Sequence, residues 1–228
     1  MTGRRRRPAP ALVGGPEAFA EAFAVSRETL DRLRTYEERL RTWQRTMNLV
    51  AASTLDGVWH RHFADSAQLV VLAPAAIRWV DLGSGAGFPG LVIAVLLAER
   101  GEARVSLVES DQRKCAFLAE VVRAMGFPHR IAVDIVPQRI EQSATRARVG
   151  EADAITARAL APMERLLALA APLFGKATVG LFLKGRTVEV ELAAAERRWR
   201  FDGEVRASRT EADGRVVIVR SLAHKTED

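Results

Sequence analysis

The sequence predicts an α/β protein with a doubly wound, mostly parallel sheet and an N-terminal helical extension. Three observations support this fold class. From residue 77 onward, short apolar runs alternate with segments of helical period. The first of these runs enters a glycine-rich turn, Gly83 to Gly90, and then an apolar segment that suits a helix, which is the order of a nucleotide-binding unit. Residues 17–73, in contrast, show helical spacing without strand-like runs.

Composition divides the chain of 228 residues into three regions. Residues 1–16 hold four consecutive arginines together with prolines and glycines, so we expect a disordered basic tail. Residues 17–73 are expected to form a helical segment that packs on residues 74–228, the α/β domain. Four of the six net positive charges come from Arg4 to Arg7. Binding to nucleic acid would therefore depend on local clusters of charge.

The helical segment is expected to contain two main helices. The first follows Ser26, a favourable N-cap residue, and carries Glu28 in its first turn. Its apolar residues recur at helical spacing and predict a buried stripe made of Leu30, Leu33, Leu40, Trp43 and Met47. The second helix is expected over residues 54–72.

On this second helix, His62 and Asp65 are three residues apart and therefore share a face, with Ser66 beside them. Two interpretations stay open. The pair forms a structural hydrogen bond, or this face contacts a substrate. A metal site is not expected, because further ligands do not follow at matching spacing.

The α/β domain is expected to contain seven strands and five helices. The predicted strands cover residues 77–81, 104–109, 131–136, 153–157, 178–183, 199–206 and 215–222. The predicted helices cover residues 91–100, 111–125, 141–148, 162–173 and 187–198. The last two strands follow one another across a turn at Asp213 and Gly214, so we expect the final strand to run antiparallel.

Two carboxylates flank the glycine turn and bear on its ligand. Residues 85–90 fit the G-x-G-x-x-G pattern of dinucleotide sites, with Glu109 roughly 20 residues further on. A pyrophosphate, however, prefers bare amides at a helix N-terminus, and Asp81 places an anion beside the turn. S-adenosylmethionine (AdoMet) carries an ammonium and a sulfonium and has no phosphate, so the acidic flanks favour it. Glu109 suits the two ribose hydroxyls.

The glycine turn with its Phe-Pro-Gly extension, Asp81 to Gly90, resembles the first motif of the ribosomal RNA small subunit methyltransferase G family (RsmG, also called GidB). Other segments that resemble this family are residues 48–50, 61–66, 109–114, 117–118, 157–159 and 183–185. They cover nearly the whole chain. The resemblance implies a class I, Rossmann-like AdoMet-dependent methyltransferase that acts on N7 of a guanine in 16S ribosomal RNA.

The resemblance also implies site residues. The positions that match the family's AdoMet contacts are Gly83, Phe88, Ile140, Glu141 and Arg158, and the turn pattern adds Asp81, Gly85 and Glu109 as cofactor-binding candidates. The candidate catalytic residues are Arg158, Arg139, Lys184, His62 and Asp65. Six basic residues are candidate phosphate contacts: Arg113, Lys114, Arg139, Arg158, Lys184 and Arg186.

The residues after the predicted fourth strand restrict the acceptor. Thr156 to Leu160 stand where amino methylation of adenine typically uses a D/N-P-P-aromatic motif. Carbon-5 methylation of pyrimidines needs a cysteine nucleophile, and Cys115, the one cysteine, belongs to a predicted helix where core packing is expected. Guanine N7 has a free lone pair and needs no base, so alignment and desolvation suffice. This agrees with N7 methylation, but the resemblance carries the assignment.

Composition also bounds the setting. No apolar run reaches the roughly 18 residues of a membrane span, and one cysteine excludes an internal disulfide. We expect a cytoplasmic monomer without a metal, whose partner is 16S ribosomal RNA in the 30S subunit or an assembly intermediate. Two other functions stay open: an NAD(P)-dependent oxidoreductase, and a noncatalytic RNA-binding module.

Overall fold

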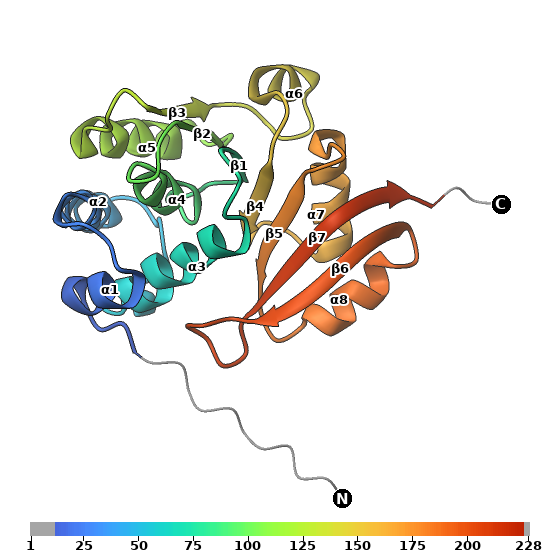
Figure 1. The fold of residues 1–228 in the computed structure, drawn as a ribbon, viewed down its shortest axis with the longest axis horizontal. Coiled ribbons are helices and arrows are strands. Elements are labelled where there is room, and N and C mark those ends of the chain that lie inside the picture. Colours follow the sequence, from blue (N-terminus) through green and yellow to red (C-terminus); the bar gives the residue numbers. More distant parts are fainter. Residues whose placement is uncertain (1–11, 226–228) are drawn as a thin grey trace, which may run out of the picture.

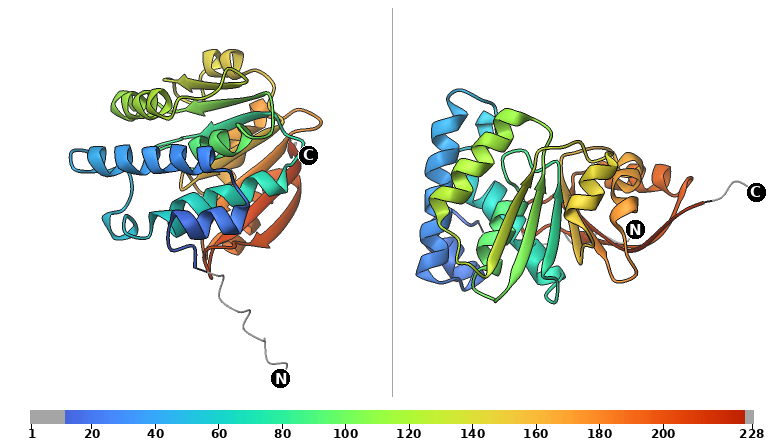
Figure 2. Two further views of the ribbon diagram at one scale, coloured as in Figure 1. Left: turned by 60° about the vertical axis from the view of Figure 1, so that its left-hand side comes forward. Right: turned by 90° about the horizontal axis from the view of Figure 1, so that it is seen from above.

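The structure is a computed structural model that describes residues 12–225, and it shows one seven-stranded sheet between layers of helices (Figures 1 and 2). The strands are β1 (Arg78–Leu82), β2 (Ala103–Val108), β3 (Ile131–Val136), β4 (Ala154–Arg158), β5 (Val179–Lys184), β6 (Trp199–Ala207) and β7 (Arg215–His224). The helices are α1 (Pro16–Phe23), α2 (Arg27–Gln44), α3 (Asp65–Leu72), α4 (Gly90–Leu97), α5 (Gln112–Met125), α6 (Ser143–Val149), α7 (Met163–Ala170) and α8 (Val188–Ala195).

The strand order is β3-β2-β1-β4-β5-β7-β6. Strand β1 pairs in parallel with both β2 and β4, so the order reverses there and the carboxyl ends of these strands border a crevice. Strand β7 lies antiparallel between β5 and β6. This confirms the predicted mostly parallel sheet with its antiparallel last strand.

The helices lie on both faces of the sheet, as Figure 2 shows in the view from above. Helices α4 and α5 cover one face, and α6, α7 and α8 cover the other. Every residue of α4 is buried, because α4 is covered in turn by α2 and α3 of the N-terminal segment. The N-terminal segment is therefore a third layer on the first face. Among the described residues, none of the helices has both the length and the apolar character that crossing a bilayer requires.

The N-terminal helices form largely as the pattern predicts. The Ser26 side chain accepts a hydrogen bond from the Thr29 amide and caps α2. Leu30, Leu33 and Leu40 are buried, and the other two residues of the stripe are partly buried against the same core. The stripe is therefore the core-facing side of α2.

Two expectations for this segment differ from the structure. The single helix over residues 54–72 is a 3-10 turn (Ala52–Thr54), a π-helical stretch (Trp59–Ala64) and then α3, with a turn that includes Gly57 in between. The tail expected over residues 1–16 falls partly outside the described residues. Within them, Val13 is buried and its amide donates to Nδ1 of His60 at 3.2 Å.

Candidate functional site

The glycine turn leaves the carboxyl end of β1 and enters α4. Gly83 and Gly85 have φ values of +66° and +56°, which glycine adopts without strain. A Cβ at Gly83 would lie 2.6 Å from Leu160 Cδ1, whereas a Cβ at Gly85 would meet nothing closer than the Gly83 carbonyl oxygen at 3.8 Å. The backbone at Gly85 therefore faces open space at the end of the sheet.

Carboxylates of this protein occupy the amide donors of the turn. The Glu109 carboxylate accepts from the Gly85 amide at 2.9 Å and from the Asp111 amide at 2.8 Å. At the N-terminus of α4, the Gly90 amide donates to Asp81 Oδ2 at 3.1 Å. These are the amides that a pyrophosphate would need. The turn is therefore closed to a dinucleotide phosphate by two internal anions.

The Asp81 side chain is buried beneath the turn and does not line the crevice. It therefore does not make the contact with the cofactor that we expected from the sequence. It is 1% exposed, and its Oδ1 accepts from Thr156 Oγ1 at 2.8 Å. Burial raises the pKa of Asp81 to about 6, while hydrogen bonds from Thr156 and Gly90 favour the ionised form. At neutral pH the carboxylate is charged, and it fixes the turn to β4 and α4.

A pocket of about 530 Å³, here called pocket A, opens beside the turn at the carboxyl ends of β1 to β4. It is lined by Gly83, Gly85, Val108, Glu109, Ser110, Lys114, Gln138, Arg139, Ile140, Glu141, Ala159, Leu160, Ala161, Pro162, Arg165 and Leu169. Five of the expected cofactor-binding residues meet here: Gly83, Gly85, Glu109, Ile140 and Glu141. The size suits a ligand as large as a nucleoside with a side chain.

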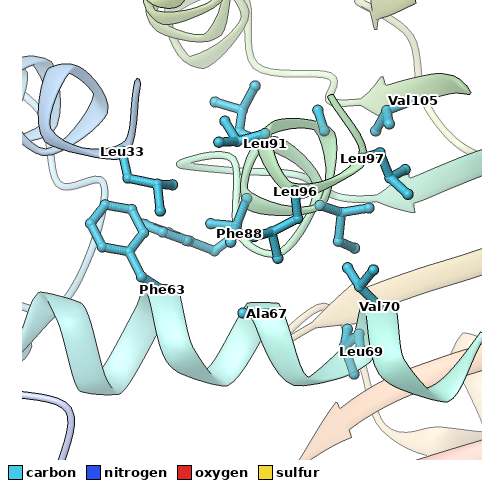
Figure 3. Packing of buried hydrophobic residues seen from close by; sticks show 14 of the residues in the cluster. Leu33, Phe63, Ala67, Leu69, Val70, Phe88, Leu91, Leu96, Leu97 and Val105 are labelled. Atoms are coloured by element: carbon cyan, nitrogen blue, oxygen red, sulfur yellow. The ribbon is translucent and has the colours of Figure 1, made fainter. Parts of the chain in front are cut away.

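Phe88 lies elsewhere than expected. It is 3% exposed and is not part of the wall of pocket A. Figure 3 shows it among apolar side chains that include Leu33 and Phe63 of the N-terminal segment. Its ring stacks on Tyr36 with centroids 5.0 Å apart, and the Tyr36 hydroxyl donates to the Ala86 carbonyl oxygen. Phe88 therefore anchors the turn to the helical layer, where burial also raises the pKa of Tyr36 well above its usual value.

A second pocket of about 500 Å³, here called pocket B, lies next to pocket A. It is lined by Asp65, Arg158, Ala159, Leu160, Ala161, Pro162, Leu183, Lys184, Gly185, Glu191, Ser208, Glu211, Gly214 and Arg215. Residues 159–162 belong to both walls. Ala159 in this shared wall has a φ of +53°, a left-handed conformation that is unfavourable for alanine. The two pockets are thus neighbours across one short, strained segment.

Arg158 ends β4 at the edge of pocket B. Its side chain is 18% exposed and NH1 lies 3.8 Å from Asp65 Oδ2. NH1 also donates to the Arg61 carbonyl oxygen at 3.3 Å, and the guanidinium lies over the Phe88 ring at 5.0 Å. Burial lowers the pKa of Arg158, and the Asp65 charge opposes this. The structure therefore brings together Arg158 and Asp65 from the expected catalytic set.

His62 does not bond to Asp65, so the interpretation as a structural His–Asp hydrogen bond is wrong. Its Nε2 lies 2.8 Å from Thr54 Oγ1, and its ring stacks on Phe88 with centroids 4.9 Å apart. Nδ1 is buried without a hydrogen-bond partner among the described residues. Burial, with the Arg158 and Arg61 charges, lowers the pKa of His62 to about 3. His62 is therefore neutral at pH 7 and packs behind the pockets, since it lines neither.

This burial predicts a pH dependence of stability. Because the pKa of His62 falls from 6.5 to about 3 on folding, acid protonates the unfolded chain first and stability is lost as the pH falls below 6.5. Urea unfolding should show that His62→Phe, which keeps the stack on Phe88, removes about 2 kcal/mol of the change between pH 7 and pH 5. Asp81 also titrates in this pH range, but it does so in both proteins, so its contribution cancels when the two are compared. Equal pH slopes in the two proteins would contradict this assignment.

Three of the other basic candidates separate into two groups. Lys184 is 10% exposed and pairs with Glu191 at 2.5 Å, so its amine is not available as the expected phosphate contact. Burial would raise the pKa of Glu191, but hydrogen bonds from Lys184 and Thr187 hold it below its usual value. In contrast, Lys114 and Arg139 line pocket A and are at least partly exposed. These two remain positioned to contact a polyanion.

Sequence reasoning missed three features of the site. Tyr36 lies 50 residues from the turn carbonyl that it binds. Ala159 adopts a left-handed backbone conformation, which only a glycine at this position would have indicated in the sequence. The segment between β6 and β7, with Ser208 and Glu211, lines pocket B. Only the repeated small residues Ala159 and Ala161 beside Arg158 could have pointed to a close approach of backbone and ligand.

The structure confirms the prediction that Cys115 packs in the core. It is 7% exposed, and burial raises the pKa of its thiol. Its Sγ donates to the Glu109 carbonyl oxygen at 3.2 Å. A cysteine nucleophile is therefore not available to pocket B. Across residues 12–225, no three His, Cys, Asp or Glu side chains gather in a way that could hold a metal ion.

Comparison with known proteins gives the family of this chain. The sequence profile of the GidB family, described as rRNA small subunit methyltransferase G, matches residues 29–218. A relative from Parvibaculum lavamentivorans, named Ribosomal RNA small subunit methyltransferase G, is 52% identical over 215 residues, which is 92% of each chain.

Solved structures show the same fold. A putative O-methyltransferase from Klebsiella pneumoniae superposes with a TM-score of 0.51 at 15% identity, over 90% of this chain and 94% of that one. A mutant of MtNAS in complex with S-adenosylmethionine superposes with a TM-score of 0.52 at 16% identity, over 90% of this chain and 76% of that one. The profile match and the relative decide the family: the chain belongs to the GidB family of AdoMet-dependent methyltransferases, described as rRNA small subunit methyltransferase G.

Proposed function

We propose that the protein transfers the methyl group of AdoMet to N7 of a guanine in 16S ribosomal RNA, with AdoMet in pocket A and the guanine in pocket B. One observation supports the choice of cofactor above all others. Glu109 and Asp81 occupy the amides of Gly85 and Gly90, so a pyrophosphate would meet two anions, whereas AdoMet has no phosphate to place there. This disfavours the NAD(P)-dependent alternative.

The lining of pocket A supports this placement of AdoMet. Each Glu109 oxygen accepts one backbone amide and keeps lone pairs for the two ribose hydroxyls. Ile140 and Leu160 offer apolar walls to an adenine, and the bare backbone at Gly85 allows close approach. AdoMet supplies an electrophilic methyl on its sulfonium. Residues 159–162 line both pockets, so the methyl group would pass to the acceptor beside this segment.

The acceptor needs no base from the protein. The N7 lone pair forms the new bond to carbon, while the electrons of the broken carbon–sulfur bond stay on sulfur. A donor placed on N7 would block this lone pair, so Arg158 is suited to O6 of the guanine or to a phosphate. Alignment and exclusion of water then carry catalysis. His62, neutral and outside both pockets, has no role in proton transfer.

The partner follows from the same proposal. N7 lies in the deep groove of A-form RNA, so the target guanine must be unpaired or flipped out to enter pocket B. Lys114 and Arg139 at pocket A can contact flanking phosphates. We expect the substrate to be the 30S subunit or an assembly intermediate, and the protein to act as a cytoplasmic monomer.

A transfer assay and a binding measurement test the proposal. The purified protein, radiolabelled AdoMet and 16S rRNA or 30S subunits from cells that lack the protein should yield labelled 7-methylguanosine at one nucleotide. Calorimetric titration should show binding of S-adenosylhomocysteine and none of NADH. Label on another atom, or binding of NADH alone, would overturn the proposal. AdoMet binding without transfer to any RNA would favour a noncatalytic module.

A further inference from the structure

Asp65 is a buried carboxylate that contacts two distant segments at once. Its Oδ1 accepts hydrogen bonds from Thr210 Oγ1 at 2.8 Å and from Ser208 Oγ at 3.2 Å, both in the loop between β6 and β7. Oδ1 also accepts from Gln68 Nε2 at 2.8 Å, and Gln68 Oε1 accepts from the Arg209 amide at 2.9 Å. The start of α3 therefore holds the loop at residues 208–210 through side chains more than 140 positions away in sequence.

The other oxygen of Asp65 faces the end of β4. Oδ2 lies 3.8 Å from Arg158 NH1, and both side chains are largely buried. Within the described residues, Asp65 is the only carboxylate within ion-pair distance of this guanidinium. In such surroundings a charge without a partner is costly. Asp65 therefore supplies the counter-charge of the Arg158 guanidinium in the wall of pocket B, where the Arg61 carbonyl oxygen and the Phe88 ring also contact it.

We propose that Asp65 is a positioning residue for methyl transfer. By holding Arg158 on one side and the 208–210 loop on the other, it sets the shape of pocket B before the acceptor base enters. It acts through Arg158, because its own oxygens are directed to protein groups. The inference rests on the proposed function, since it assigns the acceptor to pocket B. A preformed site lowers the cost of aligning the reacting atoms.

Asp65→Asn is the direct test, because asparagine keeps an acceptor for the loop hydroxyls but presents a neutral group to Arg158. With 30S subunits as the acceptor, kcat/KM should fall roughly 10- to 100-fold. The dissociation constant for S-adenosylhomocysteine should stay within about threefold of wild type, because Asp65 does not line pocket A. In an Arg158→Ala background the same change should have little further effect, a non-additivity that a purely structural role does not produce. Arg158→Lys serves as a second background.

The double variant Ser208→Ala, Thr210→Val tests the loop side and leaves the charge pair intact. It should raise KM for the RNA more than it lowers kcat. Asp153→Asn is the matched control. Asp153 accepts a hydrogen bond from Arg78 at 2.7 Å. This pair lies at the amino ends of β1 and β4, whereas the pockets lie at the carboxyl ends. Losing that pair should lower the melting temperature and leave kcat and KM unchanged.

Three results would overturn the inference: wild-type kcat/KM for Asp65→Asn, the full Asp65→Asn penalty in both Arg158 backgrounds, or wild-type KM for the loop double variant. If Asp65→Asn does not fold, the loop double variant decides. Failure of the proposed function is distinct, because then the wild-type protein itself transfers no methyl to guanine N7.

Discussion

Gly85→Asp is expected to weaken AdoMet binding at least 100-fold and to leave the protein folded. A Cβ at this position meets no protein atom closer than 3.8 Å, and Gly85 lines pocket A, so we expect the aspartate side chain to extend into the pocket instead of clashing with the fold. The new carboxylate would also lie near Glu109, whose oxygen accepts from the Gly85 amide. The new side chain would exclude the ligand from pocket A sterically, and its repulsion would push the Glu109 carboxylate out of the position in which it is proposed to bind the ribose. Isothermal titration with AdoMet measures the effect.

The control for this substitution is Gly126→Asp. Gly126 has a φ of +57°, against +56° for Gly85, and a Cβ there would also meet nothing within 4 Å. The cost of placing aspartate in a left-handed conformation, about 1 kcal/mol, is therefore shared by both variants. Only Gly85→Asp should lose the ligand. An unchanged affinity for AdoMet in Gly85→Asp would show that pocket A is not the cofactor site.

Arg158→Ala should lower kcat/KM for methyl transfer by roughly 1,000-fold, which corresponds to about 4 kcal/mol of transition-state stabilisation. The substitution removes the guanidinium that lines pocket B next to the shared wall at residues 159–162, and it leaves the Asp65 carboxylate without its counter-charge. Arg158→Lys keeps the charge but loses the planar fork, so an intermediate loss is expected. Single-turnover transfer from labelled AdoMet to 30S subunits measures both variants.

Arg78→Ala is the comparison for Arg158. Arg78 also ion-pairs with an aspartate, Asp153, but it lies at the start of β1, away from both pockets. This variant should lose some stability and keep its rate of transfer. Normal transfer by Arg158→Ala would remove Arg158 from the site and would also remove the basis for a positioning role of Asp65.

The order of elements could be predicted from the chain because the signals are local. Strand β3 begins and ends where its apolar run does, and the other strands differ from their predicted bounds by one or two residues. The turn between Gly83 and Gly90 could be recognised because its glycines and its acidic flank lie within a few positions of one another. Glu109 could be assigned to the same pocket because the carboxyl ends of neighbouring parallel strands meet at one edge.

Side-chain partners were less predictable. Phe88, expected at the cofactor, packs against Tyr36, because burying an aromatic ring against the helical layer is favourable. Asp65 shares a helix face with His62, yet it binds Thr210, which lies 145 residues away. Lys184 pairs with Glu191 instead of facing solvent. The first two outcomes depend on which distant segment packs beside the residue, and the third depends on how the turn after β5 places α8 next to Lys184. Spacing along the chain does not contain that information.

Periodicity, turn residues and the two flanking carboxylates were thus enough to indicate the sheet, the crevice and an AdoMet-like ligand, because each depends on residues close together in sequence. The division of the crevice into two pockets came only from the folded chain. Pocket B needs the end of β4, the start of α3 and the loop between β6 and β7 at one place. Long-range packing of the layers brings these segments together. The burial of apolar surface drives this packing, and the apolar pattern of the sequence does not specify which polar groups will meet.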